Sequence, residues 1–372
     1  MADPFDVVVL GAGISGLSSA RALAKRGLRV AVVERDVPGS HASSAAAGIL
    51  VARGVVRSDV PGRMFYTRSL DGYEEWVRAL ASESGQELSL REGDDFCFFP
   101  PGGKADRFRQ RLERESDPAR WEELDAPPRA LSCAARGGPW RVFRFAGERW
   151  CVPSDLLDVL LAAVERDGTL VVPNAGIPQV TDLGTTWKVV FAGGVIEAPV
   201  LLVSAGPWSG DVLRPLGWDA NLVPVRGQLA LVPRLHALDA MVHLEDTYYA
   251  VPRGDLTLVG ATVEHGEWEE NVTDRGLREL RHRLSSIFPE LDLSRAVKVW
   301  AGLRPRSRDR VPHLGWLVPG RLLVASGHYR SGISMAPRTG EVVADLVTGR
   351  DAPDDVAQLS PLRSSGGYRR IP

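Results

Sequence analysis

Cysteine is scarce in this sequence, with only Cys97, Cys133 and Cys151 among 372 residues. The three are scattered and odd in number, so they match neither the spacing of a metal site nor the disulfide framework of a small secreted protein. We therefore expect no metal ion and a reducing compartment, the cytoplasm.

An excess of charge of one sign is also lacking. The chain has 45 Lys and Arg residues against 47 Asp and Glu residues, a net charge of -2, which argues against a nucleic-acid partner. The first apolar run is interrupted by Gly11, Gly13 and Gly16, and no basic segment precedes it. This pattern predicts neither a membrane span nor a signal peptide. The length of 372 residues predicts two domains.

The clearest pattern that is present lies near the N-terminus. Val7–Leu10 is a short apolar run typical of a buried parallel strand. It is followed by the glycine-rich turn 11–16, by apolar residues at helical spacing, and by Gly27 where a helix would end. A second predicted strand, Val30–Val33, then ends in Glu34. The order of strand, glycine turn, helix, strand and acid is that of a dinucleotide-binding unit.

Each residue of that unit has a physical role. Gly11 permits the tight turn, Gly13 lets the backbone approach a pyrophosphate, and Gly16 lets the helix lie close to the strand. The free N–H groups and partial positive charge of the helix N-terminus favour a diphosphate. Glu34 can accept hydrogen bonds from ribose hydroxyls and would repel the 2′-phosphate of NADP. The unit predicts a bound dinucleotide but does not separate FAD from NAD.

Three later segments share the small residues that allow a ligand to approach the backbone. Ser40–Leu50 consists of small, hydroxylated and apolar residues directly after the second strand. Pro199–Gly210 contains a further buried strand that ends in Ala-Gly, and Leu322–Ala325 is a strand followed by Gly327 and Gly332. A helical run up to Val347 comes next. These strands and helices at the two ends of the chain predict a doubly wound α/β domain.

The middle of the chain has a different pattern, with strands that cluster together. Arg226–Val232 and Leu256–Thr262 have the composition of antiparallel strands. Helices are predicted over Asp155–Arg166, with Ser154 as N-cap, and over Thr273–Phe288. We therefore expect α/β plus α+β architecture, a Rossmann-like domain with an antiparallel-sheet domain.

These segments resemble those of the D-amino-acid-oxidase superfamily of FAD-dependent amine oxidases, and within it the glycine oxidases of thiamine biosynthesis. The resemblance extends over nearly the whole chain. It rests on the GAGISG turn and on six further motifs: SSAAAGIL at 43–50, VSAGPWSG at 203–210, YAVPR at 249–253, VGAT at 259–262, WAGLRP at 300–305 and GHYRSGISMAP at 327–337.

The resemblance implies FAD as the cofactor and a cofactor domain that the substrate domain interrupts twice. The FAD-binding domain would comprise residues 1–85, 150–222 and 312–350, the substrate domain residues 86–149 and 223–311, and the tail residues 351–372. The expected FAD contacts come from the glycine turn, the small-residue segments and the C-terminal glycine loop: Gly11, Gly13, Ile14, Ser15, Gly16, Glu34, Arg35, Ser43, Ser44, Ala46, Ala47, Gly48, Ile49, Ile177, Ala205, Gly206, Trp208, Gly302, Arg304, His328, Tyr329, Arg330, Ser331, Gly332 and Ile333.

The same resemblance implies the substrate contacts. Arg304 would bind the substrate carboxylate, because a guanidinium offers two parallel N–H groups that lysine cannot match. Tyr249 would add a hydroxyl to that carboxylate, while Tyr248 should face the other side of its strand. Arg330 would contact the substrate or the flavin. We interpret His328 as structural, because hydride transfer from a neutral amine needs no base.

Some segments depart from the family pattern. Arg91–Trp150 matches poorly, and it contains Gly102–Lys104, which we expect to be loose together with the tail 351–372. Relatives that tether FAD use a cysteine in the C-terminal half, and this chain has none there. FAD should therefore be bound without a covalent link.

The predicted activity is oxidation of glycine or a similar small amino acid or amine by oxygen, giving the imine and hydrogen peroxide. Four alternatives stay open at this stage: a D-amino-acid dehydrogenase that reduces a quinone, an RNA-modifying module, an FAD-binding sensor, and an amine oxidase of secondary metabolism with a larger substrate. The resemblance also allows a homo-oligomer, while membrane and nucleic-acid partners are not expected.

Overall fold

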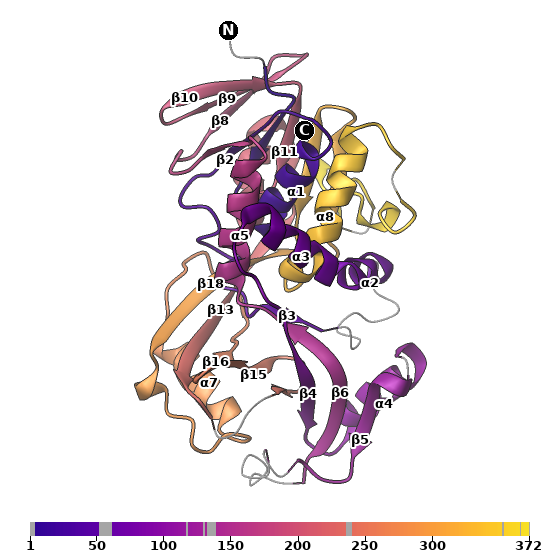
Figure 1. The fold of residues 1–372 in the computed structure, drawn as a ribbon, viewed down its shortest axis with the longest axis vertical. Coiled ribbons are helices and arrows are strands. Elements are labelled where there is room, and N and C mark those ends of the chain that lie inside the picture. The colour runs from indigo at the N-terminus through magenta and orange to yellow at the C-terminus, as the bar shows by residue number, and fades with distance from the viewer. Residues whose placement is uncertain are drawn as a thin grey trace.

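The computed structural model describes residues 4–51, 62–116, 118–128, 131, 139–235, 240–351, 353–364 and 366–371. Two lobes lie one above the other in Figure 1. The upper lobe is built on a six-stranded sheet and the lower lobe on a ten-stranded sheet.

The upper sheet draws its strands from both ends of the chain. Its order is β19-β20-β11-β1-β2-β7, and every neighbouring pair is parallel except β19 with β20. The strands are β1 (Val7–Leu10), β2 (Val30–Val33), β7 (Leu170–Val172), β11 (Val200–Val203), β19 (His313–Val318) and β20 (Leu322–Ser326). The strands predicted at 7–10 and 30–33 are confirmed at the same bounds.

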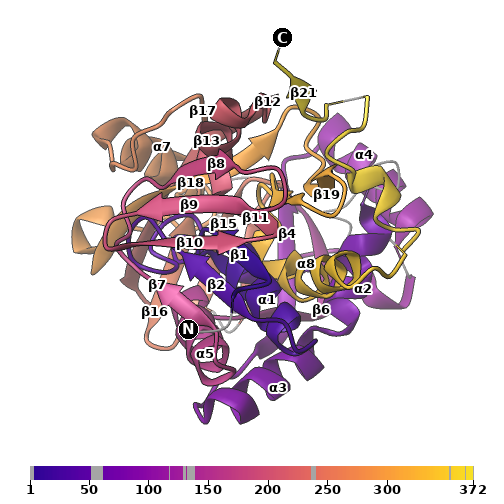
Figure 2. The same ribbon diagram turned by 90° about the horizontal axis from the view of Figure 1, so that it is seen from above.

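Both faces of the upper sheet are covered, which explains why its strands are continuously apolar. Val7 and Val9 of β1 pack among helices, whereas Val8 and Leu10 pack against a small three-stranded sheet. Figure 2 shows these two layers on opposite sides of β1 and β2. The helices are α1 (Ile14–Ala24), α2 (Arg63–Asp71), α3 (Tyr73–Ser84), α5 (Pro153–Arg166) and α8 (Gly332–Val347), and the small sheet contains β8 (Gln179–Asp182), β9 (Trp187–Phe191) and β10 (Gly194–Ala198).

The lower sheet has the order β17-β13-β16-β15-β14-β4-β6-β3, with β18 also paired to β13 and β5 to β6. Its pairs are antiparallel except β14 with β4, so the expected antiparallel sheet is in fact mixed. The strands are β3 (Ile49–Leu50), β4 (Arg91–Phe99), β5 (Trp121–Leu124), β6 (Arg141–Trp150), β13 (Leu222–Pro233), β14 (Met241–Leu244), β15 (Tyr248–Arg253), β16 (Leu256–Gly260), β17 (Glu264–His265) and β18 (Lys298–Ser307).

Two helices cover this sheet. Leu280 and Leu284 of α7 (Asp274–Leu284) are fully buried in an apolar cluster with strands β13 to β16. Phe108 and Leu112 of α4 (Gly103–Glu115) pack on Phe143 of β6. The prediction that Gly102–Lys104 is loose is therefore wrong for residues 103 and 104, which begin α4, because the apolar face of that helix is buried against the sheet.

The predicted helix bounds in the middle of the chain also need correction. Ser154 is not an N-cap: the helix starts at Pro153 after Val152, and proline suits the first turn because its missing N–H has no acceptor there. Thr273 is the N-cap of α7, where its hydroxyl accepts a hydrogen bond from the Gly276 N–H at 3.1 Å. That helix ends at Leu284 rather than Phe288.

The described part of the C-terminal tail is packed, so the prediction of a loose tail is wrong. Arg363 donates to both carboxylate oxygens of Asp309 at 2.8 Å. Tyr368 is buried with its ring against His313, and β21 (Arg369–Arg370) pairs with β12 (Trp218–Asp219). Among the helices of the described residues, none combines the length and apolar character needed to cross a bilayer.

Candidate active site

A large cavity lies at the carboxyl ends of β1, β2, β11 and β20, between the two sheets. Its volume of about 850 Å³ falls in the upper part of the range for small-molecule sites, roughly 300–1,000 Å³. This edge of a parallel sheet is where ligands bind in doubly wound folds. One end of the cavity meets the glycine turn before α1, and the other end reaches β15 and β18 of the lower sheet.

Two positions of the glycine turn, Gly11 and Gly16, have no room for a Cβ. Gly11 has φ +105°, and a Cβ there would lie 2.6 Å from the carbonyl oxygen of Ser204. A Cβ on Gly16 would fall well inside van der Waals contact of the Gly11 carbonyl oxygen, so glycine alone allows α1 to approach β1. The Ile14 N–H at the start of α1 donates to the Ser43 hydroxyl at 3.0 Å. The helix N-terminus thus faces the cavity beside a hydroxyl, as an anion site requires.

Glu34, at the end of β2, is 7% exposed and lines the same end of the cavity. Its Oε2 accepts from the Ala12 N–H at 2.7 Å, and its Oε1 accepts from the Asp36 N–H at 3.0 Å. These two backbone bonds fix the carboxylate at the edge of the cavity, where its remaining lone pairs can accept bonds from hydroxyl groups.

His41 links the two lobes near Glu34. Its Nδ1 lies 2.6 Å from Oε2 of Glu270, and its Nε2 lies 2.8 Å from Oδ2 of Asp36. The ring also contacts Trp208, over which the guanidinium of Arg35 stacks at 4.2 Å. The hydrogen bond to Glu270 raises the pKa of His41 above its usual 6.5, against the effect of burial, and Asp36 adds to the rise.

Replacing His41 by glutamine should therefore remove a stabilisation that depends on pH. Only the imidazolium can donate to both carboxylates, so the contribution is complete below about pH 6.5 and is lost as the pH rises through the higher pKa of the folded state. Thermal unfolding of the wild type and His41→Gln from about pH 6 to about pH 9 measures it. The difference in Tm should shrink with pH, and a constant difference would contradict the assignment.

The opposite end of the cavity contains Arg304 of β18 and Tyr249 of β15. Arg304 donates from Nη1 to the carbonyl oxygen of Thr262 at 3.2 Å, and no carboxylate of the described residues pairs with it. Gly227 gives it room, since a Cβ there would collide with the guanidinium. Burial lowers the pKa of Arg304 and raises the pKa of Tyr249, whose hydroxyl lies beside it. A half-buried guanidinium without an acid partner among the described residues is suited to binding a carboxylate.

Tyr248 and Tyr249 point to opposite sides of β15, as expected for consecutive strand residues. The Tyr248 hydroxyl donates to Oε1 of Glu279 on α7 at 2.5 Å, whereas Tyr249 lines the cavity. A Cβ on Gly260 would lie 2.8 Å from the Tyr249 ring, so that glycine shapes the cavity wall.

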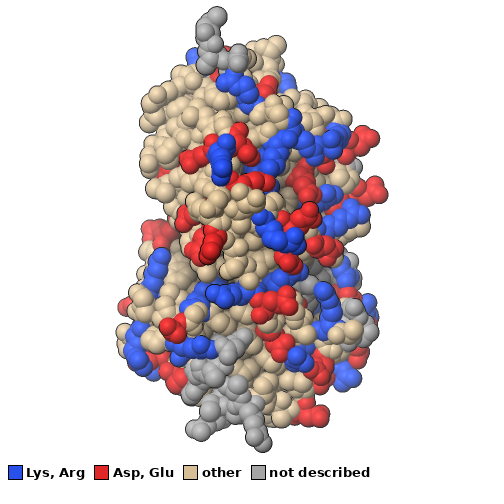
Figure 3. All heavy atoms as spheres, viewed as in Figure 1, with Lys and Arg blue, Asp and Glu red and all other residues tan. Residues whose placement is uncertain are grey.

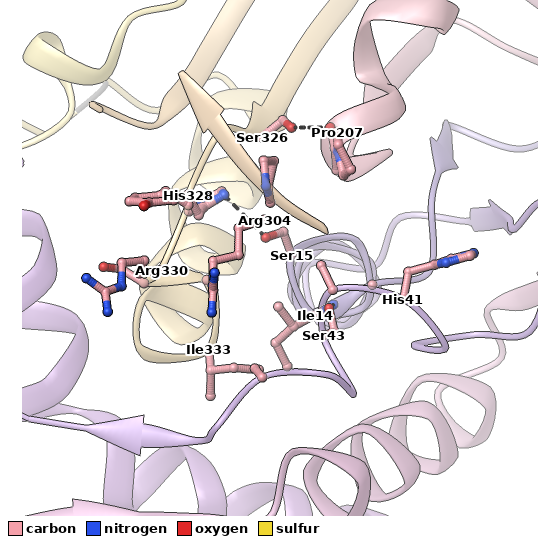
Figure 4. Close-up of a pocket in the computed structure, with 18 of the residues that line it drawn as sticks. Ile14, Ser15, His41, Ser43, Pro207, Arg304, Ser326, His328, Arg330 and Ile333 are labelled. Carbon is pink, nitrogen blue, oxygen red and sulfur yellow. Dashed lines mark hydrogen bonds between the residues drawn. The ribbon is translucent and has the colours of Figure 1, made fainter. Parts of the chain in front are cut away.

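The loop before α8 supplies His328 and Arg330. Figure 4 shows both near Arg304, on the far side of the pocket from His41. Arg330 is exposed, and its Nη2 donates to the Thr247 carbonyl oxygen at 3.4 Å. His328 is buried between the hydroxyls of Ser15 at 3.5 Å and Thr339 at 3.1 Å. Burial lowers the pKa of His328 to about 4, so the ring is neutral at pH 7.

Nearly all of the residues predicted from the sequence to bind cofactor or substrate line this one cavity. The exceptions are Gly16, which instead packs α1 against the turn, and Ser44, whose hydroxyl donates to the His41 carbonyl oxygen at 3.2 Å. Sequence reasoning missed His41, Arg111, His243 and Asp246, which also line the cavity. His41 lies inside the predicted segment 40–50, but no sequence signal marked the other three residues.

Comparison with known proteins assigns this architecture to a family. A family model described as DAO, FAD-dependent oxidoreductase, matches residues 6–346. The chain belongs to the DAO family. This DAO-family protein is 29% identical over 384 residues to a glycine oxidase of Geobacillus kaustophilus (strain HTA426), covering 98% of this chain and 99% of the relative. A glycine oxidase of Pseudomonas aeruginosa PAO1 is 32% identical over 370 residues, and the match covers 95% of this chain and 98% of the relative.

A crystal structure of glycine oxidase from Geobacillus kaustophilus has the same fold as the DAO-family protein. The TM-score is 0.89 at 27% sequence identity, and the match covers 98% of this chain and 100% of the other. The predicted family, fold and enzyme class are thus confirmed: the protein is an FAD-dependent oxidoreductase that acts on amino acids or amines.

FAD is the cofactor of the DAO-family protein, and the residues present fit it. The cradle between Gly11 and Gly13, the start of α1 and the Ser43 hydroxyl suit the diphosphate, while Glu34 suits the ribose. The small residues Ala46, Ala47 and Gly48 leave room for a flat ring along the wall that leads to Arg304.

Proposed function

We propose that this DAO-family oxidase converts glycine or a similar small amino acid into the imine, with oxygen reduced to hydrogen peroxide and the imine hydrolysed to a 2-oxo acid and ammonia. The main support for the proposal is Arg304, because its guanidinium lies in the cavity beside Tyr249 without a carboxylate partner among the described residues. The glycine oxidases that the chain resembles support a small substrate. A role in thiamine biosynthesis rests on the family resemblance alone.

The protein residues position the substrate so that its α-carbon can lose a hydride while the amine is neutral. Arg304 and the Tyr249 hydroxyl would bind the α-carboxylate, and this would fix the direction of the α-carbon–hydrogen bond. When bound, FAD supplies the two-electron acceptor and the reaction with oxygen. His328 would stay neutral between Ser15 and Thr339 and take no proton, because oxidation of a neutral amine by hydride transfer needs none.

The cysteines support FAD bound without a covalent link. Cys97 and Cys151 are buried, and neither lines the cavity. Burial raises the pKa of the Cys151 thiol to about 12, which keeps it protonated and unreactive at neutral pH. Cys133 lies outside the described residues.

The surface charge supports a small-molecule substrate over an RNA-borne one. Lys and Arg are interspersed with Asp and Glu on the face in Figure 3. The many ion pairs, such as those of Arg141 and Arg144 with neighbouring acids, further reduce the free positive charge. An RNA partner would instead need a continuous basic surface.

A hydrogen peroxide assay with a panel of small amines tests the proposal. We expect peroxide and the matching 2-oxo acid with glycine, sarcosine or a small D-amino acid, and free FAD released from the yellow protein by acid. Dye reduction without peroxide would indicate a dehydrogenase instead. If only aromatic substrates or amines with bulky N-alkyl groups react, and neither glycine, sarcosine nor a small D-amino acid does, the small-substrate proposal is wrong.

A further inference from the structure

The substrate end of the cavity holds more positive charge than one carboxylate needs. We propose that it binds small amino acids that carry a second anionic group, and that Arg111 with Arg330 forms the subsite for that group. This inference rests on the proposed function and names its substrate class. The two arginines come from α4 and from the loop before α8, and both line the cavity that contains Tyr249 and Arg304.

Arg111 belongs to the segment that matches the family pattern poorly. Its guanidinium lies over the Phe108 ring, 4.8 Å from the centroid, and only 16% of its side chain is exposed. Its Nε is buried without a hydrogen-bond partner in the described structure. The carboxylate within ion-pair range, Oδ1 of Asp246, is 3.9 Å away and beyond hydrogen-bond distance. The side chain is thus held in place by stacking, while its Nε–H has no acceptor among the described residues and its ion pair with Asp246 is long.

Arg330 contacts the same turn from the loop before α8. Its Nη2 donates to the carbonyl oxygen of Thr247 at 3.4 Å, and no acid of the described residues forms an ion pair with it. Thr247 follows Asp246 in the turn between β14 and β15, so both arginines converge on two consecutive residues. Tyr249 lies two residues further on, and its pKa responds to the charges of both Arg304 and Arg330.

The acids nearby do not balance these charges. Lys104 pairs with Glu245 at 2.8 Å, and His243 pairs with Asp95 at 2.8 Å. Asp246 is 57% exposed, and an exposed acid at 3.9 Å contributes little to an ion pair. Once the α-carboxylate occupies Arg304, two guanidinium groups would still face a single exposed acid. A second anion on the substrate supplies the missing charge and the acceptors for their N–H groups.

The second anion can be attached to the amine nitrogen or to the side chain, and two matched substrate pairs separate these sources. Iminodiacetate differs from sarcosine by a carboxylate on the N-substituent, and D-aspartate differs from D-alanine by a carboxylate on the side chain. We expect kcat/KM to favour the dianionic member of at least one pair by roughly tenfold or more, the value of a charge-assisted hydrogen bond. The pair that shows the preference identifies where the second anion is carried.

Variants of Arg111 test the subsite itself. Arg111→Gln should reduce the preference for the dianionic substrate by roughly tenfold, mainly through KM, whereas Arg111→Lys should retain part of it. Arg109→Gln is the matched control, because Arg109 lies on the same helix, is half exposed and pairs with Glu113 and Glu123 outside the cavity. That control should leave the preference unchanged.

A binding measurement keeps the inference testable if no amine reacts. Malonate and acetate are titrated against the oxidised, FAD-loaded protein, and the change in the flavin absorption spectrum reports binding. Malonate should bind more tightly than acetate in the wild type and lose most of that advantage in Arg111→Gln. If small amines are oxidised but neither dianionic substrate is preferred, or if malonate has no advantage, the second subsite is refuted while the proposed function stands. If no amine is oxidised but malonate shows the Arg111-dependent advantage, the proposed function fails and the subsite remains.

Discussion

Arg304→Ala is expected to raise KM steeply and to leave FAD bound. If Arg304 binds the substrate carboxylate as proposed, the variant removes a charge-assisted pair of hydrogen bonds worth about 2–4 kcal/mol, which is roughly 30- to 1,000-fold in kcat/KM. Among the described residues, the guanidinium donates to the Thr262 carbonyl oxygen and lies beside Tyr249, and it forms no ion pair with an acid, so we expect the fold to tolerate its removal. Steady-state peroxide formation with the best small amine, together with the flavin content, measures the effect.

Two further variants show whether the rise in KM depends on the position of the Arg304 guanidinium or on the loss of a positive charge alone. Gly227→Ala keeps the charge of Arg304 but places a methyl group where its guanidinium lies, so KM should also rise. Arg308→Ala changes an exposed arginine just beyond β18 that does not line the cavity, and it should behave as the wild type. An Arg304→Ala enzyme with the KM of the wild type would remove this residue from the substrate site.

Gly16→Ala is expected to abolish FAD binding. Its methyl group would overlap the Gly11 carbonyl oxygen, which belongs to the backbone and cannot rotate away. Helix α1 would have to move from β1, and its N-terminus would leave the position where the diphosphate binds. The protein should be purified nearly colourless, and added FAD should not restore the absorption of a bound flavin.

Gly210→Ala is the matched control for this prediction. Gly210 lies in the short helix α6 (Ser209–Leu213), and a Cβ there would meet Ala220 at 3.7 Å, an ordinary contact. This variant should stay yellow. Circular dichroism separates loss of FAD from loss of the fold, and a Gly16→Ala protein with a normal flavin content would show that close packing at this turn is not required.

Sequence reasoning succeeded where the signal was local. The unit from β1 to Glu34 is set by residues that are adjacent in the chain, and its strands were predicted at their observed bounds. It failed for α4, because Pro-Gly-Gly at 101–103 looks like a loop and only the burial of Phe108 and Leu112 against β6 shows why a helix begins there. The packing of the tail was also missed because it depends on distant residues: Arg363 pairs with Asp309, 54 residues away.

In the candidate site, too, residues marked by a local motif were predicted, and residues brought together from distant parts of the chain were not. Arg304 was predicted through the resemblance of GLRP to a family motif, and composition alone did not distinguish it from the many other arginines. His41 and Glu270 are separated by 229 residues, so no local pattern could pair them. Arg111 and Arg330 meet the same turn only because α4 and the loop before α8 fold onto it from distant parts of the chain.

The strand order of the upper sheet has a consequence for synthesis in the cell. β1 is completed by β11, and β11 in turn by β20, which ends at Ser326 of a 372-residue chain. The glycine turn therefore leaves the ribosome long before β11 and β20, the strands that complete the sheet beside it, and the cavity is not complete until β20 has been synthesised. Throughout that interval the apolar strand at 7–10 has no completed sheet around it, which is the condition under which chaperones engage unfinished chains.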